Sequence, residues 1–272
     1  MPCRMSAREQ EQDVVQADCT DDAFLGGALR MLQPRKGFRA GIDSVMLAAA
    51  VPARAGERVF EAGSGPGVAA LCLLKRVAGV ALTGVERNPH YAALAQENAR
   101  RNALADRATF ITGDALRAGK ANGPAELAGA AGRFHHAFAN PPFHEAHAAQ
   151  ASPDAGKAAA HVHDEAANLA DWLRALARMV RPKGTVTLIQ PAAALPTLLS
   201  AMQAAYLGGI RIAPLWPRSG EPASRIIVQG RRGVKAPARL LPGLILHDAA
   251  NAFTEEAENI LRHGAAFPWK EP

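Results

Sequence analysis

The feature that most limits the fold is a regular alternation of short apolar strands with helices along the chain. A strand expected in GERVFEAG is followed by a helix in VAALCLLKRVA, and VALTGVE and PHYAALAQENARRNAL repeat the same order. Further strands are expected in ATFITGDA, RFHHAFANPP and TVTLIQP, with a helix in NLADWLRALARMV before the last of them. Because strands joined by helices run parallel to one another, this alternation predicts a mainly parallel sheet with helices on both faces.

The end of the alternation departs from this pattern. GIRIAPLW and SRIIVQGRR read as two consecutive strands with no helix between them, which indicates a hairpin. The sequence therefore predicts an α/β fold with a Rossmann-like, seven-stranded, mostly parallel sheet that contains one antiparallel strand. We expect one domain over residues 22–240, a disordered tail over residues 1–21, and an extension with a short helix over residues 241–272.

The composition of the 272-residue chain is that of an ordinary globular protein, with 49% hydrophobic and 21% charged residues. No apolar run approaches the roughly 18 residues that a membrane-spanning helix needs. The opening residues are polar and lack the apolar stretch of a signal peptide. Cys3, Cys19 and Cys72 have no metal-ligand spacing, so we expect a reduced, cytoplasmic protein.

The formal net charge of +6 is less informative than its distribution along the chain. Residues 181–239 contain a single acid, Glu221, and a second basic run without acids covers residues 30–39. Segregated positive charge suits a polyanionic partner such as nucleic acid, although solvated surface arginines are an alternative explanation. The cations of the longer run are Arg181, Lys183, Arg211, Arg218, Arg225, Arg231, Arg232, Lys235 and Arg239.

A glycine-rich turn follows the first strand of the alternation. In VFEAGSGPG, the residues Gly63, Gly65 and Gly67 let the backbone pass close to a ligand, and the next helix offers free N–H groups. The spacing G-x-G-x-G differs from the G-x-G-x-x-G of dinucleotide-binding proteins. Glu86 ends the second strand, where a carboxylate can bind ribose hydroxyls, and Asp114 ends the third, near the expected position of an adenine ring.

These residues in this context resemble the class I S-adenosylmethionine-dependent methyltransferases over about residues 24–235. The resemblance implies S-adenosylmethionine as cofactor, with Glu61, the glycine turn, Glu86 and Asp114 holding its methionine, ribose and adenine parts. Glu61 departs from the more usual Asp, yet its carboxylate should still reach the amino end of the cofactor. Arg87, Ala115 and Asn140 are expected to complete this cofactor site.

The fourth strand ends in a stiff corner, Asn140-Pro141-Pro142-Phe143. It resembles the (Asp/Asn)-Pro-Pro-(Tyr/Phe) motif of methyltransferases that modify planar, conjugated nitrogens. In such a site the Asn140 side-chain oxygen and the Pro141 carbonyl accept both hydrogens of the target nitrogen, while Phe143 stacks on the flat substrate. The prolines fix the carbonyl direction because they lock φ near −65°. A structural proline turn is the alternative.

The motif is shared by adenine-N6 enzymes, guanine-N2 enzymes of ribosomal RNA and protein glutamine-N5 enzymes. The flanking segments GGALRMLQPRKGFRAGIDSVMLAAAV and APLWPRSGEPASRIIVQGRRG resemble the tRNA1(Val) adenine-N6-methyltransferase group. This resemblance implies that GFRAGIDS folds over the cofactor, with Arg39, Gly41, Asp43 and Ser44 near it. It predicts methyl transfer to an adenine N6 in RNA, with tRNA as the expected partner.

Several further residues are candidates for the substrate side. His144 and Lys157 follow the corner, and Arg218 and Arg225 flank Trp216 in the late hairpin, where they can grip phosphate or simply solubilise a sheet edge. We expect no metal, because the histidines near the corner show no repeated ligand spacing. A ribosomal RNA guanine-N2 enzyme, a protein glutamine-N5 enzyme and a non-catalytic RNA-binding protein that keeps the fold stay open as alternatives.

Overall fold

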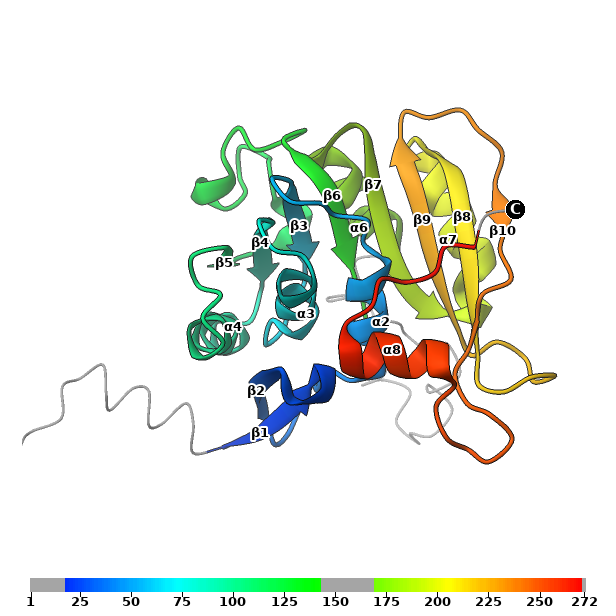
Figure 1. The fold of residues 1–272 in the computed structure, drawn as a ribbon. Helices are drawn as coiled ribbons and strands as arrows, with labels where there is room; N and C mark the ends of the chain where they lie inside the picture. The colour runs from blue at the N-terminus through cyan, green and yellow to red at the C-terminus, as the bar shows by residue number, and fades with distance from the viewer. Residues whose placement is uncertain (1–17, 143–168, 271–272) are drawn as a thin grey trace, which may run out of the picture.

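The protein is described by a computed structural model that covers residues 18–142 and 169–270. Its centre is a nine-stranded sheet with the order β10-β8-β9-β7-β6-β3-β4-β5, and β11 pairs with β8 beside this path (Figure 1). The strands are β3 (Arg58–Ala62), β4 (Ala81–Glu86), β5 (Ala108–Thr112), β6 (Phe134–Ala139), β7 (Val180–Pro191), β8 (Leu207–Trp216), β9 (Arg225–Arg232), β10 (Arg239–Leu240) and β11 (Leu244–Ile245).

The α/β class and the mostly parallel sheet are confirmed. Strand β9 is antiparallel to both β7 and β8, as the hairpin pattern predicts, and the other pairings of this sheet are parallel. The prediction of seven strands is too low, because β10 and β11 add to β8 at the edge of the sheet. Each has only two residues, which is too short to produce an alternating pattern in the sequence.

Helices cover both faces of the sheet because neighbouring residues of a strand point to opposite sides. Val59 of β3 packs into one buried cluster with α2, α3 and α8, whereas Phe60 packs into a second cluster with α6 and α7. This burial of both faces explains why the strands read as continuous apolar runs. The helices are α2 (Ile42–Ala50), α3 (Val68–Arg76), α4 (Pro89–Arg101), α6 (Leu169–Met179), α7 (Leu195–Ala204) and α8 (Glu255–His263).

A separate two-stranded hairpin precedes the sheet. Strands β1 (Cys19–Phe24) and β2 (Leu29–Pro34) pair antiparallel, and the fully buried Asn98 of α4 holds β2 in place. The Asn98 side chain accepts a hydrogen bond from the Leu32 amide at 2.7 Å and donates to the Leu32 carbonyl at 2.9 Å. The expected tail over residues 1–21 therefore overlaps a strand from Cys19 onward, and residues 1–17 lie outside the described residues.

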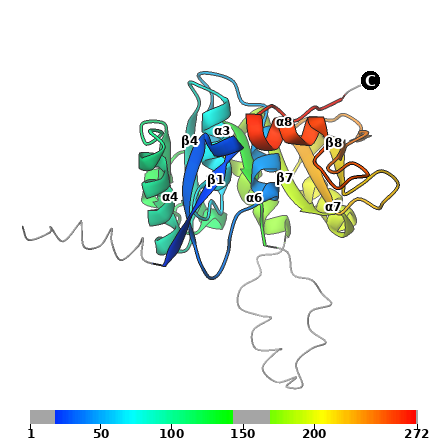
Figure 2. The ribbon, with the colours of Figure 1, turned by 60° about the horizontal axis from the view of Figure 1, so that its bottom comes forward.

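The segment after residue 240 packs on the same core as the rest of the chain. Helix α8 lies across α2 (Figure 2), and Ala257, Ile260 and Phe267 are buried in the cluster on that face. The Trp269 indole donates a hydrogen bond to the Ala50 carbonyl at 3.1 Å. This extension thus covers the apolar side of α2 that would otherwise face water. In the described ranges, no helix combines the length and apolar character that crossing a membrane requires.

Candidate functional site

The carboxyl ends of the parallel strands meet at one edge of the sheet, which we call the carboxyl edge. Gly63 follows β3, Glu86 ends β4, Asp114 follows β5 and Asn140 follows β6. In Figure 1 the arrowheads of β3, β4 and β6 point to this lower edge. The chain order reverses between β3 and β6, which are hydrogen-bonded neighbours. In open α/β sheets such a reversal forms the crevice where ligands bind.

The glycine turn adopts a backbone that other residues rarely accept. Gly63 and Gly65 have φ values of 69° and 52°. A Cβ at Gly63 would lie 2.9 Å from the Trp172 ring, and a Cβ at Gly65 would lie 3.1 Å from the Phe38 ring. The two rings therefore lie directly against the turn. Trp172 is half-buried, packs against the core cluster of its face and borders the turn, while Phe38 lies in the segment expected to cover the cofactor.

The carboxylate of Glu86 is fixed beside the turn. Its Oε2 accepts a hydrogen bond from the Gly65 amide at 2.8 Å, and its Oε1 accepts one from the Asn88 amide at 2.8 Å. Each carboxylate oxygen can accept a further hydrogen bond. Glu86 thus presents two oriented acceptors, and this arrangement fits the two neighbouring hydroxyls of a ribose.

Three buried polar atoms at this edge lack a partner within the described part of the chain: Glu61 Oε2, Ser64 Oγ and Asn140 Oδ1. Leaving such an atom unpaired costs about 1–3 kcal/mol, so three together indicate a polar ligand that supplies the missing contacts. Burial raises the pKa of the Glu61 carboxyl well above its usual range, and the nearby charge of Glu86 raises it further. A cationic group near Glu61 would relieve both effects. These residues therefore fit the amino end and sulfonium of S-adenosylmethionine.

The corner after β6 presents two acceptors. Asn140 Oδ1 is buried and unpartnered among the described residues, and Pro141 is buried beside it. The Gln190 side chain, 3% exposed on β7, donates a hydrogen bond to the Pro141 carbonyl at 3.1 Å. A carbonyl oxygen can accept two hydrogen bonds, so the Pro141 carbonyl has the capacity to accept one more from a ligand. Gln190 carries no motif in the sequence, and only the structure places it behind the corner.

The segment expected to cover the cofactor is tied down by ion pairs. The Arg39 guanidinium bonds to Thr20, Asp22 and the Pro34 carbonyl, which joins this segment to the β1–β2 hairpin. Gly41 directly precedes α2, and Ser44 is buried in its first turn. Asp43 accepts a hydrogen bond from Arg225 Nε at 2.9 Å. The structure therefore brings Arg225 to the carboxyl edge in an ion pair with Asp43.

The remaining candidates lie around this centre. Asp114 accepts a hydrogen bond from the Leu116 amide at 2.9 Å, and Ala115 is buried next to it. Arg87 is exposed just after β4. Arg218 follows β8 and pairs with Glu221 at 3.2 Å. Pro142 is exposed, and Phe143, His144 and Lys157 lie outside the described residues. Within the described ranges, no three potential ligands gather as a metal site would require.

The sequence of this chain is similar to those of known methyltransferases. The model of the methyltransferase small domain family matches residues 39–161. A relative from Aeromonas hydrophila subsp. hydrophila is 27% identical over 81% of this chain and 87% of its own length. A second, from Actinobacillus succinogenes, is 28% identical over 84% of this chain and 90% of its own. Both are named tRNA1(Val) (adenine(37)-N6)-methyltransferase.

Two solved structures share the fold. One, described as a predicted O-methyltransferase from Agrobacterium tumefaciens, is 24% identical and superimposes with a TM-score of 0.68 over 83% of this chain and 98% of its own. The tRNA (m1A58) methyltransferase TrmI from Aquifex aeolicus is 18% identical, with a TM-score of 0.50 over 75% of this chain and 73% of its own.

Proposed function

We propose that this chain, which belongs to the class I S-adenosylmethionine-dependent methyltransferases, methylates the exocyclic N6 amine of an adenine in RNA, with tRNA as the substrate class. The observation that carries the proposal is the pair of acceptors after β6. Asn140 Oδ1 is buried without a partner among the described residues, and the Pro141 carbonyl is held by Gln190. Two acceptors side by side match the two hydrogens of a primary amine on a planar ring.

The residues at the carboxyl edge have separate roles toward the cofactor. When bound, S-adenosylmethionine supplies a methyl group on a positively charged sulfur. Glu86 accepts the ribose hydroxyls, and the glycine turn lets the backbone approach the cofactor. Glu61 and Ser64 supply the buried acceptors for its amino end. Asp114 and Ala115, at the end of β5, border the adenine, and Arg39 and Asp43 secure the segment that covers it.

The acceptors at the corner make a poor nucleophile reactive. The lone pair of an adenine N6 is delocalised into the ring, and hydrogen bonds to Asn140 and Pro141 orient both of its hydrogens. This orientation aims the lone pair at the electrophilic carbon, and alignment of this kind supplies much of the rate. The nitrogen gains the methyl group and releases one proton to solvent, because an amide oxygen and a backbone carbonyl do not act as bases at neutral pH. A base inside folded RNA must be splayed out to reach the corner.

RNA is favoured over the alternative substrates for two reasons. The relatives reported above are named as adenine-N6 enzymes of tRNA, and they are matched over more than four fifths of their length. The hairpin of β8 and β9 and the residues before it are rich in arginine and nearly free of acids, which suits a polyanion. Such a substrate agrees with the cytoplasmic location that we propose on the basis of the sequence.

The test is methyl transfer from labelled S-adenosylmethionine to separate pools of unmodified tRNA, ribosomal RNA and total protein, followed by nucleoside analysis. We expect label in N6-methyladenosine from tRNA. Label in protein alone would move the assignment to glutamine-N5, and label in guanosine of ribosomal RNA would move it to guanine-N2. No transfer to any pool, with the cofactor still bound, would indicate a non-catalytic RNA-binding protein.

The Asn140→Ala variant tests the role of the corner. We expect the rate of transfer to fall by about 10²–10³-fold, the loss typical of removing one preorganised polar group in an active site. Affinity for the cofactor should change little. Asn140→Asp keeps an acceptor oxygen at this position and should retain more activity than Asn140→Ala. Equal loss of transfer and of cofactor affinity in Asn140→Ala would contradict the assigned role.

A further inference from the structure

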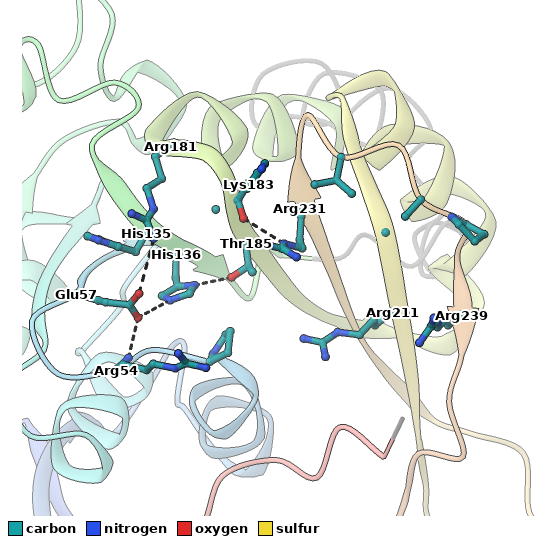
Figure 3. Close-up of a pocket in the computed structure, with 16 residues that line it drawn as sticks. Arg54, Glu57, His135, His136, Arg181, Lys183, Thr185, Arg211, Arg231 and Arg239 are labelled. Atoms are coloured by element: carbon teal, nitrogen blue, oxygen red, sulfur yellow. Dashed lines mark hydrogen bonds and ion pairs between the residues drawn. The ribbon is translucent and has the colours of Figure 1, made fainter. Parts of the chain in front are cut away.

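A second hollow lies at the opposite edge of the sheet, which we call the amino edge. It has a volume of about 480 Å³, and its walls come from the amino ends of β6, β7 and β8 and the carboxyl end of β9 (Figure 3). This hollow is separate from the carboxyl edge. Strand β6 has six residues, so the two edges are about 20 Å apart at a rise of roughly 3.3 Å per residue.

The charge of this hollow is strongly positive. Among the described residues, its lining contains six lysine and arginine side chains and a single carboxylate, Glu57. The cations come from segments far apart in the sequence: Arg54, Arg181, Lys183, Arg211, Arg231 and Arg239. Like charges repel one another, so a fold that gathers them in one concave place favours an anion between them.

The carboxylate of Glu57 already has partners within the protein. Glu57 Oε2 accepts from the Arg54 amide at 2.8 Å and contacts His136 Nε2 at 2.9 Å, and Glu57 Oε1 lies 3.9 Å from Arg181. Burial lowers the pKa of His136, so its neutral form donates to Glu57 and accepts at Nδ1 from the Thr185 hydroxyl, 2.7 Å away. Figure 3 shows this row along one wall. Glu57 thus offsets at most one of the six cations, and the described lining keeps a net positive charge.

Part of the cationic lining is held rigidly. The Arg211 guanidinium lies 4.5 Å from the centre of the Trp269 ring and donates to the Gln229 side chain. Arg231 Nε donates to the Lys183 carbonyl at 3.2 Å. Among the described residues, no acceptor lies within hydrogen-bond distance of the Arg54 guanidinium or the Lys183 ammonium group. Figure 3 shows Arg54 and Arg211 extending toward each other across the hollow.

We infer that this hollow at the amino edge binds phosphate groups of the RNA backbone. Arginine presents a planar fork that matches phosphate oxygens, and backbone contacts position an RNA without reading its bases. Among the described residues that line the hollow there is no Phe, Tyr or Trp, so it offers no large aromatic face on which a base could stack. The lining therefore suits the backbone and not a splayed base.

The position of the hollow gives it a role in substrate choice. This inference rests on the proposed function, since the methylated base would be held at Asn140, about 20 Å away. A nucleoside or a very short oligonucleotide cannot reach both places, whereas a folded RNA can. The hollow would thus raise the affinity for large folded RNA and leave the methyl-transfer step itself unchanged.

The test compares two double variants. Arg54→Gln with Lys183→Gln removes two cations from the hollow, and both positions are exposed. Lys75→Gln with Lys120→Gln removes the same charge from exposed positions that do not line it. Affinities for unmodified tRNA are measured at several salt concentrations, together with the affinity for S-adenosylmethionine.

We expect the hollow variant to bind tRNA at least about tenfold more weakly, with a slope of log K against log salt smaller by about 1–2. The control should stay within about threefold of the unmodified chain, and cofactor affinity should be the same in all three. Equal losses of tRNA affinity in the two variants would overturn the inference, because the effect would then follow net charge alone.

A second ligand separates the sources of phosphate. Inorganic tripolyphosphate is titrated into the unmodified chain and the hollow variant. Binding that is lost in the variant, while tRNA affinity is unchanged, would assign the hollow to a small phosphorylated molecule and overturn the RNA assignment. The methyl-transfer assay is independent of both arms: failure to methylate tRNA would remove the proposed function, whereas the tRNA and tripolyphosphate affinities would still decide what the hollow binds.

Discussion

The two ends of strand β3 each carry a glutamate and a glycine, and the surroundings of the two pairs differ. At the amino edge, the pKa of Glu57 lies below its usual value. Burial by itself would raise this pKa, but hydrogen bonds from His136 and from the Arg54 amide lower it by more. At the carboxyl edge, burial and the charge of Glu86 raise the pKa of Glu61, and its Oε2 has no partner in the described residues.

We interpret this difference as one between a structural acid and a candidate binding acid. Glu57 has its partners within the fold, whereas the carboxylate of Glu61 would gain from a cation that binds from outside. The described lining of the amino-edge hollow is mainly cationic, whereas the carboxyl edge carries Glu61, Glu86 and Asp114 together with arginines such as Arg225. Under the two proposals above, the carboxyl edge would hold the cofactor and the target base, while the amino edge would bind only the backbone of the same RNA.

Substitutions at the glycines that flank β3 should have the largest effect on stability of the substitutions proposed for this protein. Gly56 and Gly63 have φ values of 82° and 69°, but a Cβ at Gly56 meets nothing within 4 Å, whereas one at Gly63 lies 2.9 Å from Trp172. Gly56→Ala should cost about 1–2 kcal/mol for its backbone alone. Gly63→Ala should cost about 1–3 kcal/mol more because the ring must move. The free energy of unfolding, measured in urea, gives both costs. Equal losses in the two variants would show that the Trp172 ring moves away from the new methyl group without a measurable cost.

Two buried glutamines give the next comparison. Gln190 holds the Pro141 carbonyl, while Gln229 of β9 bonds to Arg211 of the hollow. Gln190→Met should lower kcat about tenfold, the equivalent of one lost hydrogen bond, with cofactor and tRNA affinities unchanged. Gln229→Met should leave kcat unchanged and weaken tRNA binding.

Steady-state kinetics and tRNA titration separate the two effects of the glutamine variants. Since both side chains are buried, a general loss of packing would lower the free energy of unfolding in both variants alike. A fall in kcat for Gln229→Met equal to that for Gln190→Met would contradict the positioning role of Gln190.

The sequence predicts the local features well. The alternation of strands and helices, the glycine turn and the corner after β6 are short patterns of neighbouring residues, and the first of these is confirmed in the fold. Contacts between distant residues leave no such pattern. Arg225 and Asp43 are 182 residues apart, and Gln190 is a buried polar residue near the end of a strand that the sequence identifies by its apolar residues.

The amino-edge hollow and the β1–β2 hairpin show the same limit. Excess arginine in residues 181–239 indicates a polyanion, but nothing in the sequence brings Arg54 to those residues; that requires the parallel register of β3, β6 and β7. The hairpin contains charged residues and depends on Asn98 of α4, so the start of its first strand, Cys19 to Asp21, falls within the stretch expected to be a tail.

The two glutamates should respond to pH in opposite senses. The pKa of Glu61 in the fold lies above its usual 4.5, so the stability of the cofactor-free protein should fall as pH rises from 4.5 to that higher value. A cation beside Glu61 favours the ionised form, so cofactor affinity should rise with pH over the same window, by less than about tenfold per pH unit. Glu57 acts in the opposite sense, because its lowered pKa contributes stability that is lost as pH falls below 4.5.

Calorimetry of cofactor binding in buffers of different ionisation enthalpy measures the proton released. We expect release in the unmodified chain within the window above 4.5 and none from this position in Glu61→Gln, whose side chain keeps an acceptor but does not titrate. Glu57→Gln is the matched control at the amino edge and should release protons as the unmodified chain does. Undiminished release in Glu61→Gln would show that another group takes up the charge of the cofactor, and the assignment of Glu61 to its amino end would then be wrong.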